Sequence, residues 1–269
     1  MPRSSYADAI ERIQSALEGA QEVFRRFRPG EIATEYKAGH DPVTEVDREL
    51  DTLLRKRLLR DGEGWLSEES VDDLSRLRSK QVWIVDPLDG TREFVAGIPE
   101  FSVSIALVED GRAVAGGILN PATKETFLGS LDSGITHNGI PAQSSQRMTL
   151  EGATVLASRG ESTRGEWERF RGAPFQVVAV GSVAYKLARV AAGLADATFT
   201  LSPKHEWDVA GGAALVESSG GFIRPLERTG LAFNQPLPQI SGLIACGPGL
   251  RHALLGYLEI GDLPGGGQR

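Results

Sequence analysis

The chain has 269 residues, of which 41% are hydrophobic and 24% are charged, a composition typical of folded globular proteins and not of disordered or fibrous ones. Its net charge of −7 argues against a broad surface for nucleic acid or anionic membranes, because such surfaces need many Lys and Arg contacts. No apolar run approaches membrane-spanning length, and the N-terminal residues lack the apolar segment of a signal peptide, so we expect a cytoplasmic protein.

Residues 1–142 predict two helices followed by strands. Apolar residues three, four or seven positions apart indicate a helix over 6–27, which Pro29 and Gly30 end. Thr44 supplies a polar cap for a second helix that continues to Leu58. Strands are predicted at 82–85, 101–107 and 113–119, and a turn at 109–111 joins the last two.

Residues 143–269 predict strands that alternate with helices. The strands are expected at 153–157, 175–180, 197–201 and 243–246. Helices are expected near Trp167, from Ser182, after Trp207 and from Leu250. The sequence therefore predicts an α/β protein built from two packed α/β halves, 1–142 and 143–269.

In the stretch WIVDPLDGTREF, residues 83–94, an apolar strand is followed by two acids. Pro87 fixes the backbone between Asp86 and Asp89, so both carboxylates can face one pocket with the Leu88 carbonyl between them. Gly90 permits a close backbone approach. Hard cations such as Mg²⁺ prefer oxygen ligands of this kind. Taken alone, these acids are also common turn and cap residues, so the stretch by itself leaves both interpretations open.

Several motifs occur together in one order along the chain. They are DPVTEVD (41–47), SEES (67–70), WIVDPLDGTREF (83–94), a Gly-Ser helix start (181–182) and HEWDVAGGAALVESSGG (205–221). This set, from Lys37 to Gly221, resembles the lithium-sensitive, Mg²⁺-dependent sugar and nucleotide phosphatases, the superfamily of inositol monophosphatase, fructose-1,6-bisphosphatase and 3′(2′),5′-bisphosphate nucleotidase. The resemblance implies a layered αβαβα sandwich with the active site between the halves. It leaves open whether the chain is a monomer or a homodimer.

The resemblance also implies a role for each matched residue. Glu69, Asp86 and the Leu88 carbonyl would hold a first Mg²⁺, while Asp86, Asp89 and Asp208 would hold a second. A third, weaker ion would lie beside Glu69 and Glu68. The substrate phosphate would contact the amides of Gly90 and Thr91. Glu69 and Thr91 would orient the attacking water, and Asp47 would polarise the Thr91 hydroxyl.

The substrate is indicated by smaller differences within that superfamily. Inositol monophosphatases carry a sugar-binding Glu seven residues before the WD aspartate, whereas this chain has Leu201, as bacterial bisphosphate nucleotidases of the CysQ type do. The Arg-Glu-Phe after DGT also resembles the nucleotidases. Lys186, Lys204 and His205 are the further candidates for substrate contacts.

The sequence therefore favours hydrolysis of adenosine 3′,5′-bisphosphate to AMP and phosphate by a metal-activated water. The alternatives within the class are inositol 1-phosphate, histidinol phosphate and fructose 1,6-bisphosphate. From another class, a non-catalytic protein that binds transcription or RNA machinery remains, although such a protein has no physical need for Glu69, Asp86, Asp89 and Asp208 together.

Overall fold

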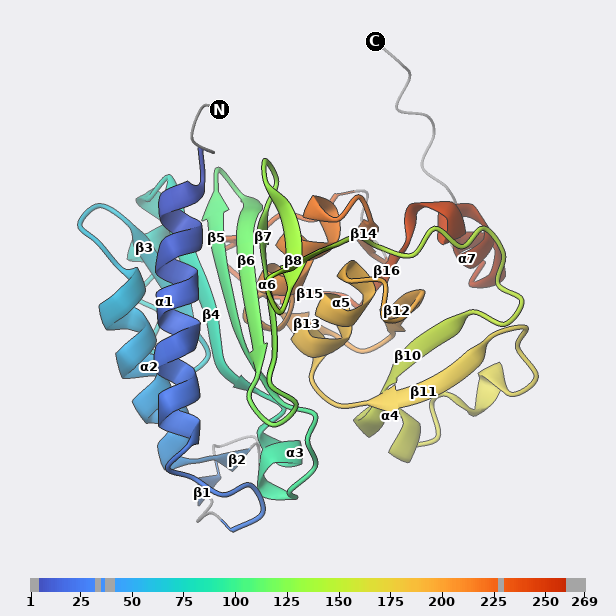
Figure 1. Cartoon of the computed structure of the whole chain (residues 1–269), viewed down its shortest axis with the longest axis horizontal. Coiled ribbons are helices and arrows are strands. Elements are labelled where there is room, and N and C mark those ends of the chain that lie inside the picture. Colours follow the sequence, from blue (N-terminus) through green and yellow to red (C-terminus); the bar gives the residue numbers. More distant parts are fainter. Residues whose placement is uncertain (1–4, 32–34, 37–41, 227–229, 260–269) are drawn as a thin grey trace.

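The computed structural model describes residues 5–31, 35–36, 42–226 and 230–259 (Figure 1). Lys37 and Asp41, where the matched motifs begin, lie outside the described residues. None of the described helices is both long and apolar enough to cross a membrane.

A seven-stranded sheet forms the first half of the chain. Only its first pair of strands is parallel, and every later neighbour is antiparallel. The strands lie side by side in chain order: β3 (Gly64–Ser67), β4 (Gln81–Asp89), β5 (Ser102–Glu109), β6 (Arg112–Asn120), β7 (Glu125–Ser130), β8 (Gly134–His137) and β9 (Ile140–Ala142). A two-stranded pair, β1 (Glu35–Tyr36) and β2 (Pro42–Val43), precedes them.

A five-stranded mixed sheet forms most of the second half. Its order is β11 (Gln176–Val180), β10 (Thr154–Ser158), β12 (Ala197–Thr200), β16 (Leu243–Cys246) and β14 (Phe222–Pro225). The first three strands are parallel, and β16 runs antiparallel to both of its neighbours. A short separate pair joins β13 (Lys204–His205) to β15 (Gln239–Ile240).

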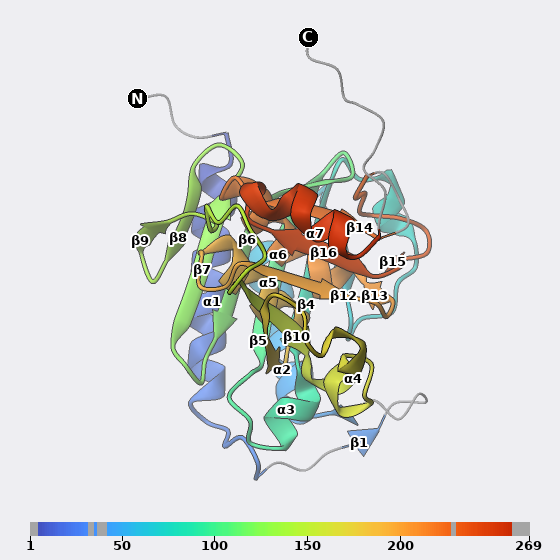
Figure 2. The same ribbon diagram turned by 90° about the vertical axis from the view of Figure 1, so that its right-hand side faces the viewer.

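Helices cover both sheets and complete five layers (Figures 1 and 2). One apolar core lies between the seven-stranded sheet and the helices α1 (Ala7–Phe24) and α2 (Glu45–Leu58). A second core joins the two sheets through α5 (Val183–Ala191) and α6 (Glu206–Ser218). A third lies on the outer face of the five-stranded sheet, under α7 (Arg251–Tyr257) and the aromatic residues of 167–175. The predicted αβαβα sandwich is confirmed.

Helix α6 lies unusually close to the first sheet because glycines meet where they cross. A Cβ atom on Gly116 of β6 would stand 2.5 Å from the Gly211 carbonyl oxygen, and one on Gly211 would stand 2.6 Å from Ser104 Oγ of β5. Any side chain at either position would clash with its neighbour. The helix of the second half is therefore seated directly on the sheet of the first, and the division at residue 142 stays a prediction about domains.

Most of the predicted elements are present. The helix expected near Trp167 corresponds to a 3₁₀ turn, Glu168–Phe170, preceded by the short helix α4 (Arg159–Thr163). The Trp167 ring stacks on Phe199 of β12 with centroids 4.4 Å apart. Strand β3 and the strands β7 to β9 were not predicted from the sequence.

Candidate active site

The acids of the site lie where strand β4 becomes irregular. Asp86 still pairs with Ser104 of β5, but the register shifts before Asp89, which pairs with Ser102. Pro87 occupies this bulge, where its missing N–H costs no ladder bond. Strand β3 runs parallel to β4, with Ser67 opposite Val85, so the residue after β3 comes alongside Asp86.

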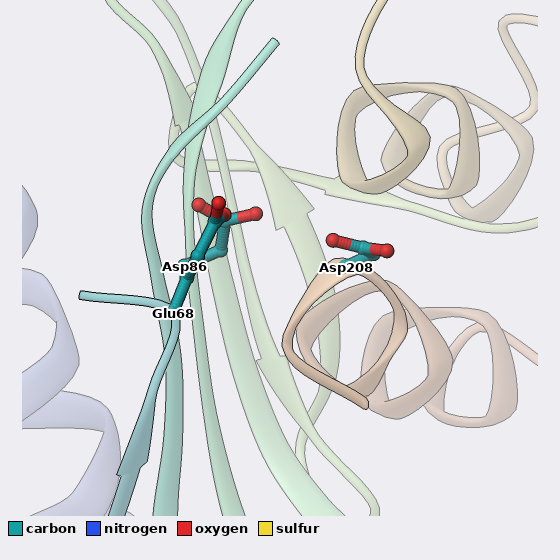
Figure 3. A group of neighbouring side chains, drawn as sticks. All are labelled: Glu68, Asp86 and Asp208. Carbon is teal, nitrogen blue, oxygen red and sulfur yellow. The ribbon is translucent and has the colours of Figure 1, made fainter. Parts of the chain in front are cut away.

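Three carboxylates gather there from separate parts of the chain. One ligand oxygen from each of Glu68, Asp86 and Asp208 lies within 4.8 Å of the other two, and Figure 3 shows the three side chains turned toward one another across the gap between β4 and α6. Asp86 is 1% exposed, and its Oδ1 accepts a hydrogen bond from the Leu88 amide at 3.0 Å. Its Oδ2 is buried without a hydrogen-bond partner among the described residues. An orphaned buried carboxylate oxygen fits a cation ligand.

Two helix starts hold the acids in place. Asp208 lies in the first turn of α6, and its Oδ2 accepts the His205 amide at 2.8 Å. Asp89 is buried, and its Oδ2 accepts the Ser182 hydroxyl and the Ala184 amide, each at 2.7 Å, at the start of α5. Each acid keeps its other oxygen for a ligand while one oxygen fixes its direction.

The acids oppose one another's ionisation. Burial raises the pKa of Asp86 well above its ordinary value, and the charges of Glu68, Asp89 and Asp208 raise it further. Burial, together with the nearby Asp89, raises the pKa of Asp208 to about 8. Burial also raises the pKa of Asp89, despite its hydrogen bonds from Ser182 and Ala184. A divalent cation among these oxygens would replace the repulsion with attraction.

Thr91 and Asp47 stand next to this group. The Thr91 hydroxyl donates to the Leu88 carbonyl at 2.9 Å and lies 3.4 Å from Asp47 Oδ1. The other oxygen of Asp47 closes the capping box of α2 by accepting the Thr44 amide and hydroxyl at 2.7 and 2.6 Å. Gly90 has a φ of +95°, and a Cβ there would meet the Glu100 carbonyl oxygen at 3.0 Å, so glycine suits this turn.

The structure separates the two adjacent glutamates. Glu68, which the sequence assigned only to a third ion, belongs to the group with Asp86 and Asp208. Glu69, the predicted ligand of the first ion, lies close enough to Asp47 for its charge to raise the pKa of that buried acid, although burial contributes more. The role of Glu69 as ligand and water-orienting residue stays a prediction.

The substrate-side candidates occupy different positions. Lys186 is buried behind Asp89, and its Nζ donates to the Ser182 carbonyl at 3.0 Å, while burial lowers its pKa to about 8. Lys204 is partly exposed, with Nζ 3.9 Å from Glu161 Oε1. The exposed His205 ring stacks on Trp207 at 4.5 Å. Leu201 follows β12 and is partly buried.

Two residues near the site were not found from the sequence. Ser182 was noted only as a helix start, yet its hydroxyl orients Asp89. Glu161 is fully buried, receives the Trp167 ring N–H at 3.0 Å, and bonds the Thr200 hydroxyl. A single Glu in a polar stretch gives no sequence signal of burial, whereas the Gly-Ser pair before α5 did mark a conformation worth attention.

The model of the inositol monophosphatase family matches residues 6–256, nearly the whole chain. The chain belongs to the inositol monophosphatase family. It is 33% identical to an inositol-1-monophosphatase of Mesorhizobium japonicum over 84% of this chain and 88% of that one. It is 31% identical to a 3′-phosphoadenosine 5′-phosphate phosphatase of Mycobacterium bovis over 79% and 80%. The crystal structure of the suhB protein of Bartonella henselae superposes with a TM-score of 0.78 at 29% identity, covering 95% of this chain and 100% of that one.

Membership in this family fixes the general activity. The chain is a phosphatase, and the inositol monophosphatase family to which it belongs acts on small phosphorylated substrates and is metal-dependent. The acidic group of Glu68, Asp86 and Asp208 is a place in this chain where a metal can bind.

Proposed function

We propose that this chain is a Mg²⁺-dependent phosphomonoester hydrolase whose ions are held by Asp86, Asp89 and Asp208 with Glu68 and Glu69. The observation that carries the proposal is the buried Asp86 carboxylate: its Oδ2 has no hydrogen-bond partner in the described chain, and one of its oxygens lies within 4.8 Å of a carboxylate oxygen of Glu68 and of Asp208. Mg²⁺ prefers such hard oxygen ligands and few of them, with water completing its shell.

The protein groups around the ions would prepare a water for attack on phosphorus. Bound divalent cations supply Lewis acidity, which makes a water acidic enough to attack and stabilises charge on the phosphoryl oxygens. The Thr91 hydroxyl has one proton, which it donates to the Leu88 carbonyl at 2.9 Å or to Asp47 Oδ1 at 3.4 Å, and in either case its lone pairs can accept a hydrogen bond from that water. Asp47 would polarise this hydroxyl when the proton turns toward it, and Glu69 is the proposed acceptor of the water's proton. The amides of Gly90 and Thr91 are the proposed phosphate contacts.

For the substrate we infer a nucleoside bisphosphate such as adenosine 3′,5′-bisphosphate. Leu201 stands where a sugar-binding Glu would be expected for inositol, and Lys204 offers a partly exposed cation for a second phosphate. The 31% identity to the mycobacterial 3′-phosphoadenosine 5′-phosphate phosphatase supports this inference. Inositol 1-phosphate is the second candidate, supported by the 33% identity to the Mesorhizobium inositol-1-monophosphatase.

A phosphate-release assay on metal-free protein separates these proposals. We expect release only after Mg²⁺ is added, inhibition by Li⁺, and a higher kcat/KM for adenosine 3′,5′-bisphosphate than for inositol 1-phosphate, fructose 1,6-bisphosphate or histidinol phosphate. A preference for inositol 1-phosphate would overturn the nucleotide assignment alone. Equal turnover with and without divalent metal would overturn the mechanism.

The Asp89→Asn variant tests the metal assignment directly. Asn retains an oxygen for the Ser182 hydroxyl and the Ala184 amide, so the fold should persist, but it removes the charge that holds a cation. We expect phosphate release at saturating Mg²⁺ to fall by roughly a hundredfold or more, since even loss of a group behind a ligand costs about 10- to 100-fold. Circular dichroism checks the fold, and wild-type turnover by this variant would refute the assignment.

A further inference from the structure

One carboxylate, that of Asp51 in helix α2, accepts hydrogen bonds from both ends of the turn that carries Glu68 and Glu69. Asp51 Oδ1 accepts the Ser67 hydroxyl at 2.6 Å, and Asp51 Oδ2 accepts the Ser70 hydroxyl at 2.8 Å. These serines immediately flank the two glutamates. Asp51 lies in the middle of α2, and no role was predicted for it from the sequence.

The Ser67 hydroxyl that Asp51 holds is in turn hydrogen-bonded to the backbone of the turn. Ser67 is buried, and its oxygen also accepts the Glu69 amide at 3.3 Å, so Asp51 fixes the hydroxyl that in turn holds the backbone of Glu69. The Trp65 ring N–H approaches the Ser70 hydroxyl at 3.4 Å. Both oxygens of Asp51 are thereby used within the protein, which distinguishes it from Asp86 with its orphaned oxygen.

Asp51 also lies one helical turn beyond Asp47, on the same face of α2. Asp47 faces the Thr91 hydroxyl, while Asp51 holds the glutamate turn. One rigid helix therefore sets the position of both groups relative to each other. Without the Asp51 bonds, the turn that carries Glu68 would lose the side-chain hydrogen bonds that join both of its ends to α2.

We propose that Asp51 is a positioning residue that sets the affinity of the site for divalent cations by holding the 67–70 turn against the acids of β4 and α6. The proposal rests on the proposed function, because it assumes that the cluster binds metal. Asp51 acts through the two serines and their turn, so its loss should weaken metal binding much more than the rate of a fully loaded enzyme.

The chain contains a matched control for this arrangement. Asp132, in the turn between β7 and β8, also bridges two serines: its Oδ1 accepts the Ser130 hydroxyl and its Oδ2 the Ser5 hydroxyl, each at 2.7 Å. It lies outside the acidic cluster and the elements that carry it. Asp132→Ala removes the same kind of bridge, so it reports the general cost of losing one.

The test compares Asp51→Ala, the double variant Ser67→Ala with Ser70→Ala, Asp51→Asn and Asp132→Ala with wild type. Mg²⁺ binding to metal-free protein is measured by calorimetry, and phosphate release is titrated with Mg²⁺. We expect Asp51→Ala and the double serine variant to bind Mg²⁺ roughly 10- to 100-fold more weakly, with kcat at saturating Mg²⁺ near wild type. Asp51→Asn, whose amide can bond both hydroxyls, should recover most of the affinity, and Asp132→Ala should retain all of it.

The outcomes distinguish a failure of this inference from a failure of the proposed function on which it rests. If wild type binds Mg²⁺ and Asp51→Ala binds it equally well, the positioning role is wrong and the metal site stands. If wild type neither binds Mg²⁺ nor releases phosphate, the proposed function itself fails. If Asp51→Ala does not fold, the double serine variant and Asp51→Asn still decide: wild-type Mg²⁺ affinity in the double serine variant, or Mg²⁺ binding by Asp51→Asn as weak as that of the double serine variant, would overturn the proposal.

Discussion

At the scale of single residues, the site is built from acids whose charged forms are destabilised by burial and by one another in the absence of a cation. A buried polar atom that loses its partner costs about 1–3 kcal/mol, and more when it is charged. Asp86 Oδ2 is such an atom in the described chain, and the raised pKa of Asp86 means that a proton, in the absence of metal, relieves part of that cost. Stability and metal binding should therefore both respond to pH.

The metal-free protein should become less stable as pH rises from about 4 to about 8. Asp208 has a pKa of about 8 when folded against 3.8 ordinarily, so in this range the folded state binds more protons than the unfolded one, and the free energy of unfolding falls with pH. Urea unfolding in EDTA at several pH values measures the slope. Asp208→Asn should flatten it, and saturating Mg²⁺ should reverse the loss near pH 8. A slope unchanged in Asp208→Asn would contradict the assignment.

At the scale of elements, a buried polar network joins the loop after the glutamate turn to the start of α6. The Arg76 side chain is 1% exposed and bonds Asp72 at 2.7 Å and Asn234 Oδ1 at 2.7 Å. The backbone amides of Asn234 and Gln235 donate to the buried Glu206, at 2.7 and 2.9 Å. Segments more than 150 residues apart in sequence are thereby connected beside the elements that carry Glu68 and Asp208.

Replacing Asn234 by glycine should show how much this network contributes to the free energy of unfolding. Asn234 has a φ of +59°, so glycine keeps the backbone conformation and the amide to Glu206 but removes the acceptor of Arg76. We expect the free energy of unfolding to fall by about 1.5–3 kcal/mol, as for a lost hydrogen bond to a buried charge. Asn138→Gly is the control, because Asn138 has a φ of +51° but is exposed. Equal losses in both variants would argue against the network.

At the scale of the whole molecule, α6 belongs to both halves. It contributes Asp208 to the site, packs on α5 and the five-stranded sheet, and touches β5 and β6 through Gly211 and Gly116. The second half of the sequence thus supplies part of the covering layer of the first sheet. Neither half carries the complete set of acids.

Adding a methyl group at this crossing should disturb the entire assembly. The Gly211→Ala side chain would meet Ser104 Oγ at 2.6 Å and the Ile105 backbone at 3.0 Å. We expect a loss of about 1–3 kcal/mol in the free energy of unfolding, typical of overpacking, together with weaker Mg²⁺ binding because α6 shifts with Asp208. Gly256→Ala in α7, where an added Cβ would meet no atom within 4 Å apart from its chain neighbours and the backbone of its own helix, is the control and should be neutral or stabilising. An unchanged Gly211→Ala protein would contradict the close packing.

The sequence predicted most of the helices and strands because these depend on local patterns, whereas the αβαβα layers and the roles of the acids were implied by the resemblance of the motifs to a known superfamily. Alternating strands and helices and the DPLDGT stretch are readable within a few residues. The difference between Glu68 and Glu69 was not readable, because it depends on the parallel register of β3 with β4 and on the serines held by Asp51. Strand β3 has only four residues and follows a turn at Gly62, so its apolar pattern was too short to be recognised as a strand.

The glycine contact between α6 and β6 has a consequence for how this chain can distinguish one substrate from another. Because α6 packs so closely on the sheet, it cannot tilt or slide to admit a larger or differently shaped ester. The position of α6 is therefore the same for every substrate. Under the proposed function, the choice between phosphate esters is therefore left to loops such as the stretch between β12 and α6, which contains Leu201 and Lys204.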